Sequence, residues 1–255
     1  MAKLPKPDGF ETYAEAKRRC AYKVRLLSRG GKREQRLAAR LGRCSKADPC
    51  ASGACDICLG HARLQLYRES QAILASRPDW TRASIIGNGF LKTPGQLTSV
   101  NLNAINKTIN KRLERSSLSS RILFAGIDIS LNLEDNIIVG WQPHIYALIE
   151  GKNTRQLQEA IKAAFPPEPT AAMPYDFDQV TDPSARITYL FKAVFKRRSR
   201  YTTSSGHART RFQPLKWDEQ RELLLLLDQY PIHARLILRG VRRNGRRFII
   251  IINKD

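Results

Sequence analysis

The chain has 255 residues, 42% of them hydrophobic, and its 44 Lys and Arg residues against 23 Asp and Glu residues give a net charge of +21. This length can bury the core of one large domain or two small ones, and a charge of this size favours a polyanion as the partner. No run reaches the ~20 apolar residues of a membrane-spanning helix, and the first residues lack the apolar stretch of a signal peptide. We therefore expect a cytoplasmic nucleic-acid-binding protein without a membrane partner, with a merely charged and solvated surface as the alternative.

The beginning of the chain is basic and helical in character. Residues 10–43 are rich in Ala, Arg, Lys, Glu and Leu, which predicts one or two helices interrupted at Gly30-Gly31. Cys20 lies alone in this stretch and is interpreted as a small apolar side chain. Composition divides the chain into a basic helical segment at 1–43, a Cys-rich knuckle and helix at 44–80, and a domain at 81–255 that ends in a basic hairpin.

Four cysteines fall within fifteen residues. Clustered thiols in a reducing compartment favour a metal over disulfides. Cys55 and Cys58 form a CxxC knuckle, whose two sulfurs can reach one tetrahedral ion at ~2.3 Å. Free thiols on a mobile loop are the alternative. The sequence predicts a structural zinc site with the ligands Cys44, Cys50, Cys55 and Cys58, and with His61 as an alternative ligand.

Helices and a short strand are predicted after the cysteines. A helix from His61 to about Ala75 ends before Pro78, and a short strand follows at 84–87. Residues 96–113 carry apolar residues at helical spacing with basic residues between them, which predicts a basic amphipathic helix.

Two long strands are predicted in the middle of the chain. Residues 122–133 alternate between apolar and polar side chains, and 137–149 return beside them after a turn at 134–136, so the pair forms a hairpin. Alternation places Gln142, His144 and Tyr146 on one face of the second strand, and Asp128 on the first strand is expected near His144. Such side chains can converge on one metal ion or one phosphate.

A helix capped by Asn153 and closed at Pro166 is predicted next, followed by a second helix over 186–196. On that second helix, Tyr189 lies on the same face as Lys192 and Lys196. Neighbouring ammonium groups favour the phenolate and attract phosphate, as a tyrosine nucleophile requires. The alternative is an ordinary surface tyrosine.

The last part of the chain predicts a helix over 217–229, then a strand at 234–239 that pairs with 247–252 across a turn at Asn244-Gly245. Basic side chains around this turn and after the tyrosine helix are expected to contact nucleic acid: Lys196, Arg197, Arg198, Arg200, Arg242, Arg243, Arg246 and Arg247. The predicted fold class is α+β, a central antiparallel sheet with helices on one face, preceded by the helical and Cys-rich zinc-knuckle segment.

The order of these elements resembles the HUH superfamily of single-strand endonucleases, which includes rolling-circle replication initiators of plasmids and related transposases. Residues 140–151 (GWQPHIYALIEG) are similar to the second motif of that family, and 122–132 (ILFAGIDISLN) to the first. Tyr189-Leu190-Phe191-Lys192 is similar to the third, and 50–69 (CASGACDICLGHARLQLYRE) resemble the Cys-rich segment of plasmid initiators. The resemblance covers about residues 44–200.

The resemblance implies a DNA-nicking enzyme, with residues 81–255 as its HUH-like nuclease and DNA-binding domain. Tyr189 would attack the phosphate and stay attached to the new 5′ end, Lys192 would stabilise the developing charge, and His144 would hold Mg²⁺ or Mn²⁺. Further weak ligands would be Asp128, Gln142 and Tyr146.

The motifs also depart from the family pattern. Tyr146 stands where the family has its second histidine, and a phenol is a poor ligand for a hard cation. Gln142 stands where many plasmid members have a further histidine, and Ala193 where the plasmid-type pattern has its tyrosine. Two alternatives to nicking therefore stay open: a non-catalytic zinc-containing protein that binds single-stranded or hairpin DNA on the same scaffold, and a basic RNA-binding protein.

Overall fold

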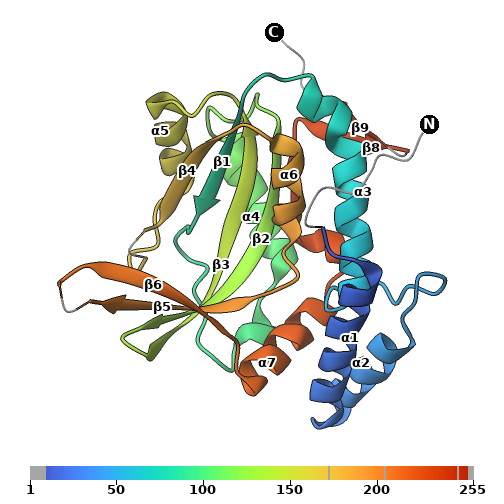
Figure 1. Cartoon of the computed structure of the whole chain (residues 1–255). Helices are drawn as coiled ribbons and strands as arrows, with labels where there is room; N and C mark the ends of the chain where they lie inside the picture. Colours follow the sequence, from blue (N-terminus) through green and yellow to red (C-terminus); the bar gives the residue numbers. More distant parts are fainter. Residues whose placement is uncertain (1–9, 172, 204, 246, 252–255) are drawn as a thin grey trace.

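The computed structural model describes residues 10–171, 173–203, 205–245 and 247–251. One sheet runs through the middle of the molecule, and the two N-terminal helices lie to one side of it beside a long helix (Figure 1). The mixed α+β architecture with N-terminal helices and a mostly antiparallel sheet confirms the predicted fold class. In the described ranges, no helix is both long and apolar enough to cross a membrane.

The N-terminal helices are α1 (Tyr13–Ser28) and α2 (Lys32–Arg43), separated at the predicted Gly30-Gly31. Thr12 begins α1 through a capping box, in which its hydroxyl accepts from the Glu15 backbone N–H while the Glu15 carboxylate accepts from the Thr12 N–H. The next helix, α3 (Asp56–Ala75), begins five residues earlier than predicted. As a result, the CxxC knuckle forms the first turn of α3.

The main sheet has seven strands in the order β4-β1-β3-β2-β5-β6, with β7 also paired to β2. All its pairs are antiparallel except the short parallel pair of β2 and β5. The strands are β1 (Trp80–Ile85), β2 (Leu123–Glu134), β3 (Ile137–Glu150), β4 (Tyr175–Val180), β5 (Lys196–Thr202), β6 (Ala208–Pro214) and β7 (Leu236–Arg239). The sequence did not predict β4, and it placed the strand at 84–87 instead of 80–85.

The predicted β2–β3 hairpin is confirmed. Asp135 and Asn136 form its turn with φ values of 47° and 68°, the left-handed conformation that a tight hairpin turn requires and that Asp and Asn tolerate. The register sets Asp128 opposite His144 and Ser130 opposite Gln142. The predicted proximity of Asp128 to His144 therefore follows from strand pairing.

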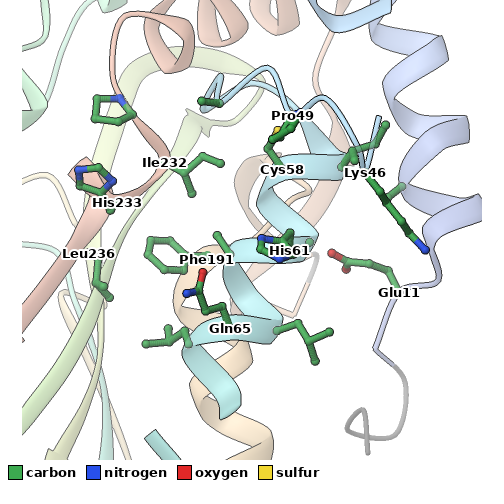
Figure 2. A pocket seen from close by; sticks show the side chains of 18 of the residues that line it. Glu11, Lys46, Pro49, Cys58, His61, Gln65, Phe191, Ile232, His233 and Leu236 are labelled. Carbon is green, nitrogen blue, oxygen red and sulfur yellow. The ribbon is translucent and has the colours of Figure 1, made fainter. Parts of the chain in front are cut away.

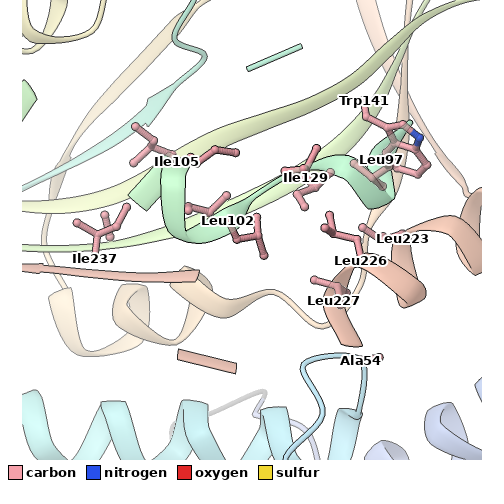
Figure 3. Packing of buried hydrophobic residues seen from close by; sticks show 14 of the residues in the cluster. Ala54, Leu97, Leu102, Ile105, Ile129, Trp141, Leu223, Leu226, Leu227 and Ile237 are labelled. Carbon is pink, nitrogen blue, oxygen red and sulfur yellow. The ribbon is translucent and has the colours of Figure 1, made fainter. Parts of the chain in front are cut away.

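Helices cover both faces of the sheet, whereas the sequence predicted them on one face only. The first face packs against α4 (Leu102–Glu114), α5 (Arg155–Ala164) and α7 (Trp217–Asp228), and Figure 3 shows Ile129 of β2 and Trp141 of β3 near apolar residues of α4 and α7. The second face packs against α3 and the segment 183–191. The apolar residues of this second face include Phe124 and Leu148. Its polar residues Asp128 and His144 lie further along β2 and β3, toward the part of β2 that pairs with β5.

The predicted helix over 186–196 is wrong. Asp182 caps a short helix, α6 (Pro183–Ile187), whose first residue is the proline, and a 3₁₀ turn, η2 (Thr188–Phe191), follows it. The chain is extended at Lys192 and enters β5 at Lys196. Hydrogen bonding of β5 to both β2 and β6 outweighs the helical spacing of apolar residues, so Tyr189, Lys192 and Lys196 do not share a helix face.

The predicted pairing of the last strands is also wrong, and the turn comes one residue later than predicted, because Asn244 still belongs to a strand and pairs with Arg247. That turn joins β8 (Val241–Asn244) to β9 (Arg247–Ile250), while β7 pairs with β2 instead. Gly240, with φ 70°, separates β7 from β8. Arg246 lies outside the described residues.

Two helix starts also differ from the sequence predictions. Helix α4 begins at Leu102 behind the cap Asn101, after a 3₁₀ turn, η1 (Leu97–Ser99), where the sequence predicted one helix from residue 96. The cap of α5 is Thr154 and not Asn153, because the Thr154 hydroxyl accepts from the Leu157 N–H. A last 3₁₀ turn, η3 (Ile232–Arg235), leads into β7.

Candidate functional site

The four clustered cysteines converge, as the sequence predicts. The sulfurs of Cys44, Cys50, Cys55 and Cys58 all lie within 4.8 Å of one another, and they are the only group of three or more His, Cys, Asp or Glu side chains with this geometry in the described residues. They come from the end of α2, the loop after it and the first turn of α3. His61 is exposed on α3 and is not part of the group.

The donor set fits a tetrahedral ion. A tetrahedron of sulfurs at ~2.3 Å from a metal has S···S edges of about 3.8 Å. The Cys44 sulfur lies 3.5 Å from the Cys58 sulfur and 3.5 Å from the Cys55 sulfur, and the Cys50 and Cys58 sulfurs lie 3.8 Å apart. The Cys50 backbone N–H donates to the Cys44 sulfur at 3.4 Å. A buried four-cysteine cluster of this kind could hold a metal ion such as zinc.

Residues of helix α1 contact the cluster and the first turn of α3. The Cys20 sulfur lies 4.0 Å from the Cys55 sulfur, and donation from the Cys20 thiol is the largest of the effects that hold the pKa of Cys55 below its usual range. Asp56 is fully buried and forms ion pairs with Lys23 (2.8 Å) and Arg19 (3.3 Å). The sequence interpretation of Cys20 as an isolated apolar side chain therefore missed its place beside the cluster.

A second constellation lies on the polar face of β2 and β3. The Asp128 Oδ2 atom lies 3.2 Å from His144 Nε2 and 2.8 Å from Lys192 Nζ, while the Ile129 N–H donates to the other carboxylate oxygen at 3.0 Å. Burial raises the pKa of the Asp128 carboxyl, but the charges and hydrogen bonds of His144 and Lys192 outweigh it and hold the pKa below its usual range. Asp128 is therefore an ionised carboxylate beside an ammonium group.

Tyr146 and Gln142 flank this cluster without adding a charged ligand. Burial raises the pKa of Tyr146 against the opposing charges of Arg82 and Arg186, so its phenol stays protonated at neutral pH. The Lys192 ammonium lies 5.5 Å from the centre of the Tyr146 ring. Gln142 donates through Nε2 to the Pro143 carbonyl oxygen at 3.0 Å. The predicted metal ligands are thus close together, and Lys192 lies at the carboxylate oxygen that a cation would bind.

Gly126 brings η2 to this face. A Cβ atom on Gly126 would lie 1.8 Å from the Leu190 carbonyl oxygen, so only glycine lets the backbone of η2 pack on β2 at this point. Tyr189 is 51% exposed, and with Asp182 and Arg186 it lines a cavity of about 250 Å³. The structure therefore places Tyr189 on a 3₁₀ turn and not on the predicted helix, while Lys192 follows that turn and contacts the same Asp128 oxygen as His144.

The strands β5 and β6 form an arm, defined here as residues 196–214, that projects from the end of the sheet (Figure 1). Phe212 on the arm is 58% exposed, and the cationic groups of Lys196 and Arg198 lie 5.9 and 5.8 Å from the centre of its ring. Arg198 pairs across from Asn132, four residues along β2 from Asp128. The aromatic and basic face of the arm therefore continues the polar face of the sheet.

The other predicted nucleic-acid contacts have mixed surroundings. Arg197 is buried and pairs with Glu219 at 3.2 Å, while Arg200 forms an exposed pair with Glu134 at 3.4 Å. Arg243 pairs with Glu69 of α3 at 2.7 Å. Arg242 and Arg247 are exposed on the β8–β9 hairpin.

Two further features were not predicted from the sequence. Arg82 on β1 forms ion pairs with Asp176 and Asp178 of β4, which neutralise it on the polar face. Arg235 is only 2% exposed, and the alternating apolar residues around it gave no sign of a buried guanidinium.

The arm was not predicted from the sequence either. Basic residues at every second position of Lys196–Thr202 were a signal for its first strand.

Comparisons of the chain with protein-family models, with curated proteins and with solved structures found no match.

Proposed function

We propose that the protein binds single-stranded or hairpin DNA along the arm and the polar face of the sheet. The observation that carries the proposal is the exposed Phe212 ring between Lys196 and Arg198. Proteins that hold single strands combine aromatic side chains, on which bases stack, with basic groups along the phosphate backbone. In the described residues, neither Lys196 nor Arg198 forms an ion pair with a carboxylate; Lys196 is exposed and Arg198 is half-buried, so phosphate can reach Lys196 fully and Arg198 in part.

The rest of the arm adds charge to this surface. Arg209 and Arg211 of β6 are exposed, and Tyr201, which lies opposite Arg209, is 39% exposed. Because successive side chains of a strand point to opposite faces, these three residues lie on the face opposite Phe212. Each face of the arm therefore carries an aromatic ring and basic groups. Together with a net charge of +21, this favours a flexible polyanion over a protein partner.

A salt titration tests the proposal. We expect a labelled oligothymidylate to bind with an affinity that falls linearly on a logarithmic salt scale, because each neutralised phosphate releases a counterion. Lys196→Ser combined with Arg198→Ser would lower the slope by roughly 1.4, at ~0.7 per single-strand phosphate contact. Lys107→Ser with Lys111→Ser on α4 is the matched control, since both residues are exposed and equally basic. Equal slopes for the two double variants would refute the arm as the binding surface.

The four-cysteine cluster is proposed to hold structural zinc. Four thiolates give a closed tetrahedral site without an open position for substrate, which is typical of structural centres. Zinc would then tie the loop after α2 to the first turn of α3 and fix α1 above them through Asp56 and its two basic partners.

Nicking through Tyr189 is a second candidate function, favoured by its exposure and by its cavity with Arg186. Lys192 would balance charge on the phosphate, and His144 would hold Mg²⁺ or Mn²⁺ if the ammonium left Asp128. The test is formation of a covalent protein–DNA adduct from a single-stranded oligonucleotide with each metal. This candidate requires an adduct that Tyr189→Phe abolishes; binding without an adduct under any divalent ion leaves the non-catalytic proposal.

A further inference from the structure

Arg235 is a buried cation that forms no direct ion pair within the described residues, and the opposite charge that acts on it is the buried Asp128 carboxylate. It is 2% exposed, and its Nη1 and Nη2 atoms have no hydrogen-bond partner in the described residues. Its guanidinium lies over the rings of Phe191 (5.8 Å) and Phe195 (5.3 Å). Burial lowers the pKa of Arg235 to about 10, so the group is still charged at neutral pH. A buried charge of this kind is costly unless an anion pairs with it.

A cavity of about 910 Å³ adjoins the chain segment that carries Arg235, with His233 and Leu236 at its wall (Figure 2), although Arg235 itself does not line it. Phe191 forms part of its wall, and so do the chain neighbours of Arg235, His233 and Leu236. The ring of Phe191 thus contacts both the cavity and the guanidinium. Because Phe191 lines the cavity and Arg235 does not, a ligand in the cavity would reach the guanidinium only where this ring gives way.

The lining of the cavity has the chemistry of a nucleotide site. Its wall between η3 and α3 is largely apolar, and Figure 2 shows Phe191, Ile232 and Leu236 around the space, with the polar ends of His61 and Gln65 on the α3 side. Glu11 is the one carboxylate among the lining residues, and it pairs through Oε2 with Arg63 and Arg19. Since Lys46 and Arg243 also line the cavity, its lining carries a net positive charge. The volume of the cavity lies in the range of about 300–1,000 Å³ usual for small ligands.

We propose that this cavity binds one nucleotide unit, with its phosphate on the Arg235 guanidinium and its base against the apolar wall. A guanidinium offers two parallel N–H donors that match the oxygens of a phosphate, and Nη1 and Nη2 are the two donors left unpaired here. If the nucleotide belongs to a DNA strand that the arm binds, the inference rests on the proposed function. A free nucleotide would offer the same phosphate and base.

Calorimetric titration with thymidine 5′-monophosphate, thymidine and inorganic phosphate tests this site. We expect saturable binding of the monophosphate, at least tenfold weaker binding of thymidine, and loss of that tenfold difference in Arg235→Met. Arg235→Lys would keep part of it. His61→Trp, on an exposed position that lines the cavity, would block binding by filling the space without touching the buried cation. An oligonucleotide with a 5′-phosphate that competes with the monophosphate would identify a strand end as the source; failure to compete would leave a free nucleotide.

The outcomes separate this site from the arm. Phe212→Ala would leave monophosphate binding unchanged while it weakens binding of an oligonucleotide. No saturable monophosphate binding by the wild-type chain, or unchanged discrimination in Arg235→Met together with unchanged affinity in His61→Trp, would overturn the nucleotide site and leave the arm proposal intact. A wild-type chain that binds the monophosphate but no oligonucleotide would overturn the proposed function instead.

Discussion

At the scale of single residues, the polar face depends on one ionised carboxylate. Asp128 accepts from Lys192 and lies beside His144 on a strand whose other side is core. The sequence predicted the proximity of Asp128 and His144 because a hairpin register follows from alternation and a turn. It could not predict that Lys192 reaches the same oxygen, since the path of the chain after η2 is set by tertiary strand pairing.

Asp128→Asn would destabilise the protein by about 2 kcal/mol at pH 7, because the Lys192 ammonium loses a charged hydrogen-bond acceptor. The folded-state pKa of Asp128 is lowered, so its contribution is complete above the unfolded pKa of about 4 and disappears as the pH falls through the folded value. Urea unfolding from pH 7 down to pH 2 measures the difference between wild type and variant. Asp178→Asn is the control; it is expected to lower the free energy of unfolding by about 1 kcal/mol or less, because that side chain is 56% exposed. A difference that grows towards low pH would contradict the assignment.

At the scale of elements, Gly126 decides where η2 packs. Gly126→Ala would place a methyl group into the Leu190 backbone, and we expect a loss of about 1–3 kcal/mol together with a shift of the Tyr189 segment. Gly42→Ala within α2 is the matched control: its Cβ would have no atom nearer than 3.9 Å, so it would stabilise the protein by about 0.5–1 kcal/mol. Thermal unfolding and the fluorescence of a probe at position 189 measure both effects. Equal changes for the two variants would show that η2 does not contact the sheet as described.

The elements also explain which parts of the fold the sequence predicts. Helices α1, α2 and α7 and the β2–β3 hairpin have local signals, namely a capping box, a glycine pair, an apolar periodicity and a turn that needs positive φ. The segment 186–196 has apolar residues at helical spacing, but its residues from 196 onward form a strand held by partners far away in sequence. Likewise, β7 pairs with β2 over a separation that no local pattern records.

At the scale of the whole molecule, the four-cysteine cluster joins the N-terminal helices to the rest of the core. Removal of metal by a strong chelator is expected to unfold this region, because metal binding and folding are coupled in such sites. Cys58→Ser would lower the zinc content and the melting temperature, whereas Cys20→Ser would keep the zinc content, since Cys20 is outside the ligand group. Metal analysis and calorimetry of the purified chains check both. A full zinc content in Cys58→Ser would exclude the four-sulfur site.

The molecule as a whole combines this helical part with a sheet whose open end is basic. We propose that Phe212 and its two cationic neighbours at this end form a platform for single-stranded nucleic acid. Base stacking on an aromatic side chain contributes about 1–3 kcal/mol, so its loss weakens binding by roughly 5- to 150-fold.

Fluorescence anisotropy of an oligothymidylate at fixed salt tests this claim most directly. The control is Tyr22→Ala, because Tyr22 is 42% exposed on α1, away from the arm. Phe212→Ala is predicted to lower the affinity at least fivefold, while Phe212→Trp and Tyr22→Ala keep wild-type affinity. An affinity of Phe212→Ala equal to that of the wild-type chain would show that the Phe212 ring does not bind nucleic acid.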